Sequence, residues 1–332
     1  MGKRVGAECY GESATASTRR RAGPWPDHEK TRRADGEGRL DKGGAGRHSG
    51  GMDDERYRRL AALLRGYGSC LVAYSGGVDS ALLAVVARRE LGGRMLAAIA
   101  DSPSLARREL AEALELAACF DVPVRVVRTE EFGNPAYTAN PSNRCYYCKH
   151  ELFTRLAPLA RAEGFAVIAY GENASDAGDH RPGAQAAAEF QVRAPLKEAG
   201  LSKADIRALS AALGLPTADK PQLACLSSRI PYGEVVAPEK LRMIEAAENA
   251  LRNLGFHDVR VRHHELKQGA LARLELGPAE LPRLADAGLA ARAAAAVQAA
   301  GYRHATLDLL GYRRGSLNEP PAAARPAVAG RG

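Results

Sequence analysis

From Met52 to Leu213, short apolar runs alternate with longer stretches that place apolar residues at helical spacing. Consecutive apolar positions within a run are typical of strands that are buried on both faces of a parallel sheet. Repeated strand–helix units of this kind predict a Rossmann-like α/β fold, with a parallel sheet and helices on both of its faces. The expected strands are 70–74, 95–100, 124–127 and 166–170, and the expected helices are 53–65, 80–91, 104–118, one that begins near Tyr146, and 202–213.

The pattern changes after Pro238, where helices and strands no longer alternate regularly. This order predicts a smaller C-terminal α+β domain with antiparallel pairing. Its expected elements are a helix at 239–254, strands at 258–262, 270–276 and 304–309, and two alanine-rich helices within 280–299. We therefore predict four segments, namely an extension at 1–51, a first domain at 52–236, a C-terminal domain at 237–316 and a tail at 317–332.

The two end segments show no periodic pattern and are rich in Gly, Ala, Pro or Arg, so we expect both to be disordered. Because Met52 directly precedes the first helical pattern, we expect residues 1–51 to be an idle extension or a mis-assigned start. N-terminal mass determination of the native protein decides between these, since a mature chain that carries Trp25 excludes a mis-assigned start.

The segment between the first expected strand and its helix has the composition of a phosphate-binding loop. It consists of Ser75, Gly76, Gly77, Val78, Asp79 and Ser80. The glycines allow the backbone to approach an anion closely, and the free N–H groups of the following helix point to the same place. The segment lacks the lysine of a Walker loop and matches the pyrophosphate loop (PP-loop) of enzymes that split ATP between its α and β phosphates. The alternative is an ordinary tight turn.

Ligands of parallel sheets bind beyond the carboxyl ends of the strands, so we expect ATP to contact the backbone at Ala73, Ala100 and Gly171 as well. The loop that follows the fourth strand contains Asp176 and Asp179. Carboxylates in this position suit a Mg²⁺ ion carried by phosphates, which takes oxygen ligands and keeps several waters. A solvated acidic loop is the alternative.

Three of the six cysteines lie in expected loops rather than in apolar patterns. Cys145 and Cys148 are three positions apart at a helix start, and Cys225 lies in a later strand-end loop. Three thiolates suit an iron–sulfur cluster with one open iron. A zinc site, with His150 or His180 as fourth ligand, and a redox or unliganded nucleophilic set are the alternatives.

Five arginines are candidates for binding a phosphate or carboxylate of the substrate. Arg260 and Arg262 alternate on one expected strand and therefore share a face, with Glu248 and Glu275 as expected neighbours. The alternative for this pair is a solvated strand face. The full set is Arg181, Arg193, Arg229, Arg260 and Arg262.

The net charge of +8 adds little to this picture, because half of the excess lies in residues 1–51. A nucleic-acid partner is therefore not expected. No apolar run reaches the roughly 18 residues that a membrane span needs, and the N-terminus lacks the apolar core of a secretory signal. We expect a cytoplasmic protein without a membrane partner.

Several motifs together resemble the LarE family of ATP-dependent sulfur transferases. These are the loop 75–80, the segment 144–149, Asp176 with 179–183, the segment 192–196, and CLSSRIPYG at 225–233. The resemblance covers 53–315 and implies adenylation of pyridinium-3,5-biscarboxylic acid mononucleotide by Mg²⁺·ATP, followed by displacement of AMP by sulfur. Two rounds give the bis-thiocarboxylate of the nickel-pincer cofactor of lactate racemase.

The family contains two kinds of sulfur donor. Some members use only the cysteine that matches Cys225 and sacrifice its sulfur, whereas others have all three cysteines and are thought to bind a 4Fe–4S cluster. The resemblance to the second kind implies that this chain turns over catalytically. It also implies a hexamer and a pathway with a pyridinium carboxylase and a nickel insertase. His180 and Ser175 depart from the family pattern, and the second departure leaves Asp176 and Asp179 to bind the metal.

Three other functions remain open. A tRNA-thiolating PP-loop enzyme would need a basic face with aromatic residues, which are sparse here. An ammonia-using PP-loop synthetase has no need for three loop cysteines. A nucleotide-binding module without catalytic activity would not need the intact loop with Asp79.

Overall fold

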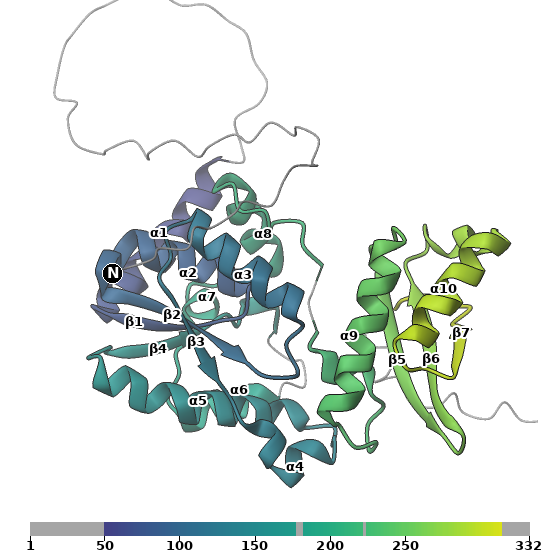
Figure 1. Cartoon of the computed structure of the whole chain (residues 1–332). Helices are drawn as coiled ribbons and strands as arrows, with labels where there is room; N and C mark the ends of the chain where they lie inside the picture. The colour runs from purple at the N-terminus through teal and green to yellow at the C-terminus, as the bar shows by residue number, and fades with distance from the viewer. Residues whose placement is uncertain (1–49, 177–181, 222–223, 314–332) are drawn as a thin grey trace, which may run out of the picture. The chain divides into compact units, whose positions relative to one another are not determined.

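The computed structural model describes residues 50–176, 182–221 and 224–313 (Figure 1). Within them the first sheet is parallel, with strand order β3-β2-β1-β4. The central strand β1 is buried at every position, because neighbours flank it on both sides. The strands are β1 (Cys70–Tyr74), β2 (Met95–Asp101), β3 (Val124–Arg128) and β4 (Val167–Tyr170). The predicted α/β fold is confirmed, and the four strands match their predicted bounds within one residue.

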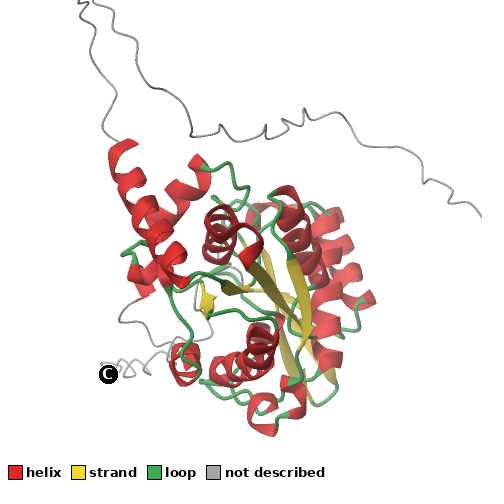
Figure 2. Cartoon of the chain, turned by 90° about the vertical axis from the view of Figure 1, so that its left-hand side faces the viewer, coloured by secondary structure: helices red, strands yellow, loops and turns green. Residues whose placement is uncertain are grey.

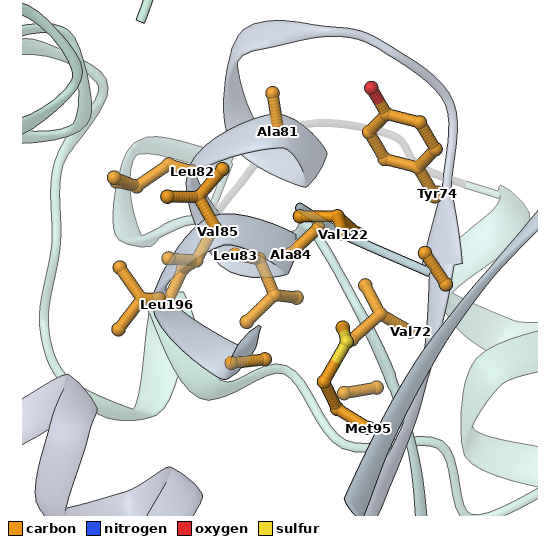
Figure 3. Close-up of a cluster of buried hydrophobic side chains, with 14 of the residues drawn as sticks. Val72, Tyr74, Ala81, Leu82, Leu83, Ala84, Val85, Met95, Val122 and Leu196 are labelled. Atoms are coloured by element: carbon orange, nitrogen blue, oxygen red, sulfur yellow. The ribbon is translucent and has the colours of Figure 1, made fainter. Parts of the chain in front are cut away.

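Helices cover both faces of this sheet (Figure 2). Alternate residues of β1 point to opposite faces, so Val72 and Tyr74 join one hydrophobic core and Leu71 and Ala73 join the other. The first core, part of which Figure 3 shows, packs α2 against β1 and β2. Its helices are α1 (Gly50–Tyr67), α2 (Val78–Leu91), α3 (Arg107–Cys119) and α8 (Lys203–Ala212), and those of the second core are α5 (Arg144–Ala162) and α6 (Pro182–Glu189).

Strand β3 differs from the expectation of strands apolar on both faces. It lies at the edge of the sheet and leaves all five of its residues exposed or half-exposed, with Val126 42% exposed. An edge strand has a neighbour on one side only, so its sequence can keep Arg125 and Arg128 at solvent positions.

The second sheet lies in the C-terminal part and has the order β5-β6-β7. β5 (Val259–Leu266) and β6 (Gly269–Leu276) pair antiparallel, as predicted, and β7 (His304–Leu307) pairs parallel with β6. α9 (Pro238–Asn253) and α10 (Ala287–Ala299) pack with them around Phe256 and Val259. The described residues belong to one compact unit, and the predicted domain boundaries stay predictions.

The prediction of two alanine-rich helices is wrong. Only α10 is an α-helix, and the segment before it forms a short 3₁₀ helix, η5 (Leu281–Ala285). Asp286 separates the two, because its side chain accepts a hydrogen bond from Leu289 N and caps α10.

Several short elements were not predicted from the sequence, and α3 begins three residues later than predicted. Arg193 also forms an isolated parallel bridge with Ala169 of β4, beyond the four-stranded ladder. None of the described helices is long and apolar enough to cross a bilayer. The short elements are α4 (Pro135–Thr138), α7 (Pro195–Glu198), η1 (Gly92–Arg94), η2 (Glu131–Gly133), η3 (Ala174–Asp176) and η4 (Leu226–Arg229).

Candidate functional site

The loop 75–80 joins β1 to α2 and closes on itself. Ser80 Oγ accepts a hydrogen bond from Ser75 N at 3.1 Å and lies 3.0 Å from Ser75 Oγ. The N-cap residue of α2 is Gly77, which has no side chain that could cap the helix. The first N–H groups of α2 therefore remain available for an anion, as predicted for a phosphate loop.

Gly76 meets two separate constraints. Its φ is +70°, a backbone conformation that disfavours other residues, and an added Cβ would lie 2.6 Å from Ala113 Cβ on α3. Gly171 is similarly confined, because its added Cβ would lie 2.9 Å from Ser80 N. Gly76 allows α3 to approach the loop 75–80 closely, and Gly171 allows the loop after β4 to approach the start of α2.

Ala73, Ala100 and Gly171 lie at or just beyond the carboxyl ends of β1, β2 and β4, which are neighbours in the sheet. The parallel register pairs Ala73 with Ala98 and with Tyr170, so the three backbone segments share the edge that carries the phosphate loop. Their contact with ATP stays a prediction.

Asp79, in the first turn of α2, is held from two sides. Lys203 Nζ lies 2.6 Å from its Oδ2, and Asn173 Nδ2 donates a hydrogen bond of 3.2 Å to its Oδ1. Neither partner was predicted from the sequence. The only local sign was the capping box of Ser202 and Asp205, which fixes the start of α8 directly before Lys203.

The loop after β4 brings Asp176 near the same edge, where its Oδ2 accepts a hydrogen bond from Asn173 N at 3.1 Å. Asp179, His180 and Arg181 lie outside the described residues. Among the described residues, no three His, Cys, Asp or Glu side chains form a group that could hold a metal ion. Mg²⁺ carried by phosphates needs only one or two carboxylates, so the oxygen donors Asp79 and Asp176 fit it.

The three cysteines interact electrostatically across two segments. Cys145 and Cys148 lie in the first turns of α5, and Cys225 directly precedes η4. Desolvation and the Cys225 thiol raise the pKa of Cys145. Desolvation, Glu131 and Cys225 raise the pKa of Cys148. The donor set suits an iron–sulfur cluster, but the thiols would have to draw together to become its ligands, since no described group has metal-holding geometry.

Arg144 connects these cysteine segments. Its side chain is almost fully buried and donates a 3.0 Å hydrogen bond to Ser227 O, and a further hydrogen bond to Asn140 Oδ1. Its Nη2 lies 4.0 Å from Cys225 Sγ. Burial opposes the charged form of Arg144, but the ionisable groups around it, Cys225 first and then Cys145 and two tyrosines, together offset this and raise its pKa.

Arg229 also holds the backbone at Cys225. It is 2% exposed and donates hydrogen bonds to Ala224 O at 2.6 Å and to Cys225 O at 3.2 Å. Its Nε lies 2.9 Å from Oε1 of the buried Glu248 on α9. Burial acts to raise the pKa of Glu248, but Arg229 and other nearby arginines hold it below its usual value.

Arg262 of β5 extends this support. Its Nη1 donates a hydrogen bond of 2.8 Å to Ser228 O, and its Nη2 lies 2.7 Å from Glu275. Both Arg260 and Arg262 are buried, so the alternative of a solvated strand face is wrong, and the expected proximity of Arg262 to Glu275 is confirmed. Arg260 lies over the ring of Tyr312.

A buried cluster of three hydroxyl groups, not predicted from the sequence, joins the Cys225 loop to the segments that carry Ser104 and Tyr137. Ser104, Tyr137 and Ser227 form a triangle with O···O distances of 2.5, 2.8 and 2.9 Å. Asn140, with a φ of +55°, donates hydrogen bonds to Ile230 O and Pro231 O. No sequence signal marks such contacts, because the partners are up to 123 positions apart.

Arg193 does not join the other predicted residues. Its guanidinium pairs with Glu198 and lies over the ring of Tyr67. Its backbone bridges Ala169 of β4, but Glu198 and Tyr67, the partners of its side chain, are not among the predicted site residues. Roles of the five arginines in substrate binding stay predictions.

No protein-family model matches the chain. It is 46% identical over 248 residues to an uncharacterized protein of Synechocystis sp., covering 75% of this chain and 91% of that protein. It is 34% identical over 262 residues to the pyridinium-3,5-bisthiocarboxylic acid mononucleotide synthase of Lactiplantibacillus plantarum, covering 78% of this chain and 92% of the synthase. An uncharacterized protein of Methanocaldococcus jannaschii is 27% identical over 195 residues, covering 59% of this chain and 74% of that protein. The similarity to the synthase spans most of both chains, and this protein therefore belongs to the LarE family.

Proposed function

We propose that this protein is an ATP-dependent sulfur transferase that converts pyridinium-3,5-biscarboxylic acid mononucleotide to the bis-thiocarboxylic acid mononucleotide. The observation that carries the proposal is the 34% identity to a synthase of that product over 92% of its length. The site adds chemical support, because one compact unit contains the glycine-rich loop 75–80 before α2, two thiols in the first turns of α5 and a third directly before η4.

The loop 75–80 serves the first half of the reaction. A substrate carboxylate oxygen attacks the α-phosphorus of ATP, the bond between the α-phosphorus and the bridging oxygen breaks, and pyrophosphate leaves. The N–H groups at the start of α2 stabilise the charge that develops on the leaving group. Asp176 would hold a Mg²⁺ ion, which when bound would supply further positive charge there. Asp179 and Arg181 are proposed to assist from the same loop. The product is an acyl-adenylate, whose carbonyl carbon is a far better electrophile than that of a carboxylate.

The cysteine segment serves the second half. A sulfur nucleophile attacks the carbonyl carbon and AMP leaves with the electron pair of the bond that breaks. Arg144 is placed to stabilise negative charge on sulfur at Cys225, since its Nη2 lies 4.0 Å from Sγ and its hydrogen-bonded partners, Asn140 Oδ1 and Ser227 O, are neutral. Arg229 holds the carbonyl groups of Ala224 and Cys225 and so fixes the backbone that presents the thiol.

We propose that Cys145, Cys148 and Cys225 hold a 4Fe–4S cluster, which when bound supplies a sulfide that can be replaced between turnovers. Anaerobic reconstitution should then give about four irons per chain and a broad visible absorption. Colourless protein in which Cys225 loses one sulfur for each sulfur inserted would identify the sacrificial route instead. By family resemblance we also propose a cytoplasmic hexamer that acts between a pyridinium carboxylase and a nickel insertase.

Pyrophosphate release tests the proposal against its competitors. The protein should release pyrophosphate from Mg²⁺·ATP when pyridinium-3,5-biscarboxylic acid mononucleotide is added. Release that depends on bulk tRNA would indicate a tRNA-thiolating enzyme. Release that depends on nicotinic acid adenine dinucleotide with ammonia would indicate an amide-forming synthetase. Nucleotide binding without release in any of the three mixtures would indicate a binding module.

A further inference from the structure

Asp79 creates an electrostatic problem inside the phosphate loop. Its carboxylate lies in the first turn of α2, where the free N–H groups attract an anion, yet a carboxylate repels a polyphosphate. A cation must therefore stand beside Asp79 whenever ATP is bound. In the structure that cation is the ammonium of Lys203, 2.6 Å from Asp79 Oδ2.

The fold places Lys203 there through several contacts. It is the first residue of α8, whose start is fixed by the capping box of Ser202 and Asp205. Its own N–H donates a hydrogen bond of 3.0 Å to Ser175 Oγ, in the loop that also supplies Asn173 to Asp79. Ala174 N donates to Leu201 O at 2.8 Å, which ties the same two segments together. The backbone that carries this ammonium is thus anchored to the loop after β4, which also contains Asp176.

The pair is nevertheless accessible to exchange. The side chains of Lys203 and Asp79 are 31% and 22% exposed, whereas those of Arg229 and Glu248 are each 2% exposed. A lysine ammonium is a compact charge on a flexible stem, so it can turn to a new acceptor without moving the backbone. A divalent cation from solvent can therefore reach the carboxylate of Asp79.

From these observations we propose that Lys203 occupies the cation position beside Asp79 in the nucleotide-free protein and passes to the polyphosphate when Mg²⁺·ATP delivers a metal ion to Asp79. Lys203 is then both a placeholder for the metal and a phosphate-binding residue. The inference rests on the proposed function only in requiring that the loop bind ATP.

Two variants of the pair should change binding in opposite directions. In Lys203→Gln, Asp79 loses its counter-charge, so ATP binding measured in EDTA should weaken about tenfold or more, and Mn²⁺ binding without nucleotide, followed by EPR, should tighten about tenfold. In Asp79→Asn the repulsion disappears and Lys203 is released, so ATP binding in EDTA should tighten and Mn²⁺ binding should weaken. Lys220→Gln is the matched control, because Lys220 pairs with Glu112 at 2.9 Å and lies 20% exposed, and it should change neither affinity.

A purely structural role for Lys203 predicts a lower melting temperature with both affinities unchanged, and that result would overturn the inference. If Lys203→Gln does not fold, Asp79→Asn still decides, since unchanged or weaker ATP binding in EDTA contradicts the proposed repulsion. Wild-type protein that binds ATP neither in EDTA nor with Mg²⁺ would instead reject the adenylation half of the proposed function.

Discussion

The phosphate loop at 75–80 and the segment 224–229 that carries Cys225 are fixed by different means. The first is one contiguous turn between a strand and a helix, closed by Ser75 and Ser80 and shaped by backbone conformation. The second consists largely of the short 3₁₀ helix η4 and is held by buried arginines from α5, η4 and β5 that donate to its carbonyl groups. The anion loop depends on backbone geometry, whereas the thiol segment depends on buried charge.

This difference has a chemical consequence. Backbone N–H groups carry no net charge, so they need no counter-ion of their own when a polyphosphate leaves the loop. A buried guanidinium needs a compensating partner at all times, so the Cys225 segment is rigid only while each arginine keeps its acceptors.

The largest expected effect separates the two regions functionally. Cys225→Ser removes a ligand of the proposed cluster, or the sulfur donor itself on the sacrificial route, but leaves the phosphate loop intact, so product formation should fall below about one thousandth of the wild-type rate. Pyrophosphate release in a single turnover should persist, because adenylation precedes sulfur attack. Mass spectrometry and a pyrophosphate assay on the same samples check this. Loss of both signals together would show that the two regions do not act in separate steps.

The next prediction tests the buried charges. Arg229→Met leaves Glu248 buried without its main partner, which should reduce the free energy of unfolding by about 3 kcal/mol or more. Arg242→Met, which breaks an exposed pair with Glu239, should cost less than about 0.5 kcal/mol. Urea denaturation of both variants measures the difference. Equal losses would mean that buried charge does not hold the Cys225 segment.

The backbone of the phosphate loop is tested by Gly76→Ala. The positive φ and the 2.6 Å approach to Ala113 Cβ should cost about 1–3 kcal/mol of stability and weaken ATP binding. Gly93→Ala is the control, since its added Cβ meets nothing within 4 Å. Calorimetric melting and ATP titration report the two effects. A variant with unchanged ATP affinity would refute the account of the loop.

The smallest effect at neutral pH concerns β5, the strand that carries Arg262. Burial, helped by the charge of Lys240, lowers the pKa of His263 from 6.5 to about 4. Below pH 6.5 the unfolded chain therefore binds a proton at this position that the folded protein does not bind until about pH 4. The free energy of unfolding should then fall as the pH drops from 6.5 to 4, by up to about 1.4 kcal/mol per pH unit. The contribution is absent above pH 6.5, where both states are neutral.

His263→Gln should remove this part of the pH dependence while retaining a polar group opposite Tyr302, whose oxygen lies 3.2 Å from His263 Nδ1. Denaturation at several pH values compares the variant with the wild type. Parallel curves for the two proteins would show that His263 does not titrate as its burial requires.

The sequence predicted what depends on local pattern. The strand at 70–74, the loop 75–80 and the α/β fold follow from consecutive apolar residues and from glycines beside a helix start. The sequence could not reveal the partners of Asp79, because Lys203 reaches it from 124 positions away. Nor could it distinguish an arginine that binds substrate from one that holds the fold, as Arg229 does through Glu248. That distinction depends on burial, which only tertiary packing determines.

The central claim is that ATP cleavage at the phosphate loop activates a carboxylate that then receives sulfur. Its most direct test is mass spectrometry of the products formed by anaerobically prepared protein with Mg²⁺·ATP and pyridinium-3,5-biscarboxylic acid mononucleotide. The account predicts a product in which one oxygen of each carboxylate is replaced by sulfur, with one pyrophosphate and one AMP released per replacement. Unchanged substrate, or pyrophosphate released without any sulfur-containing product, would contradict it.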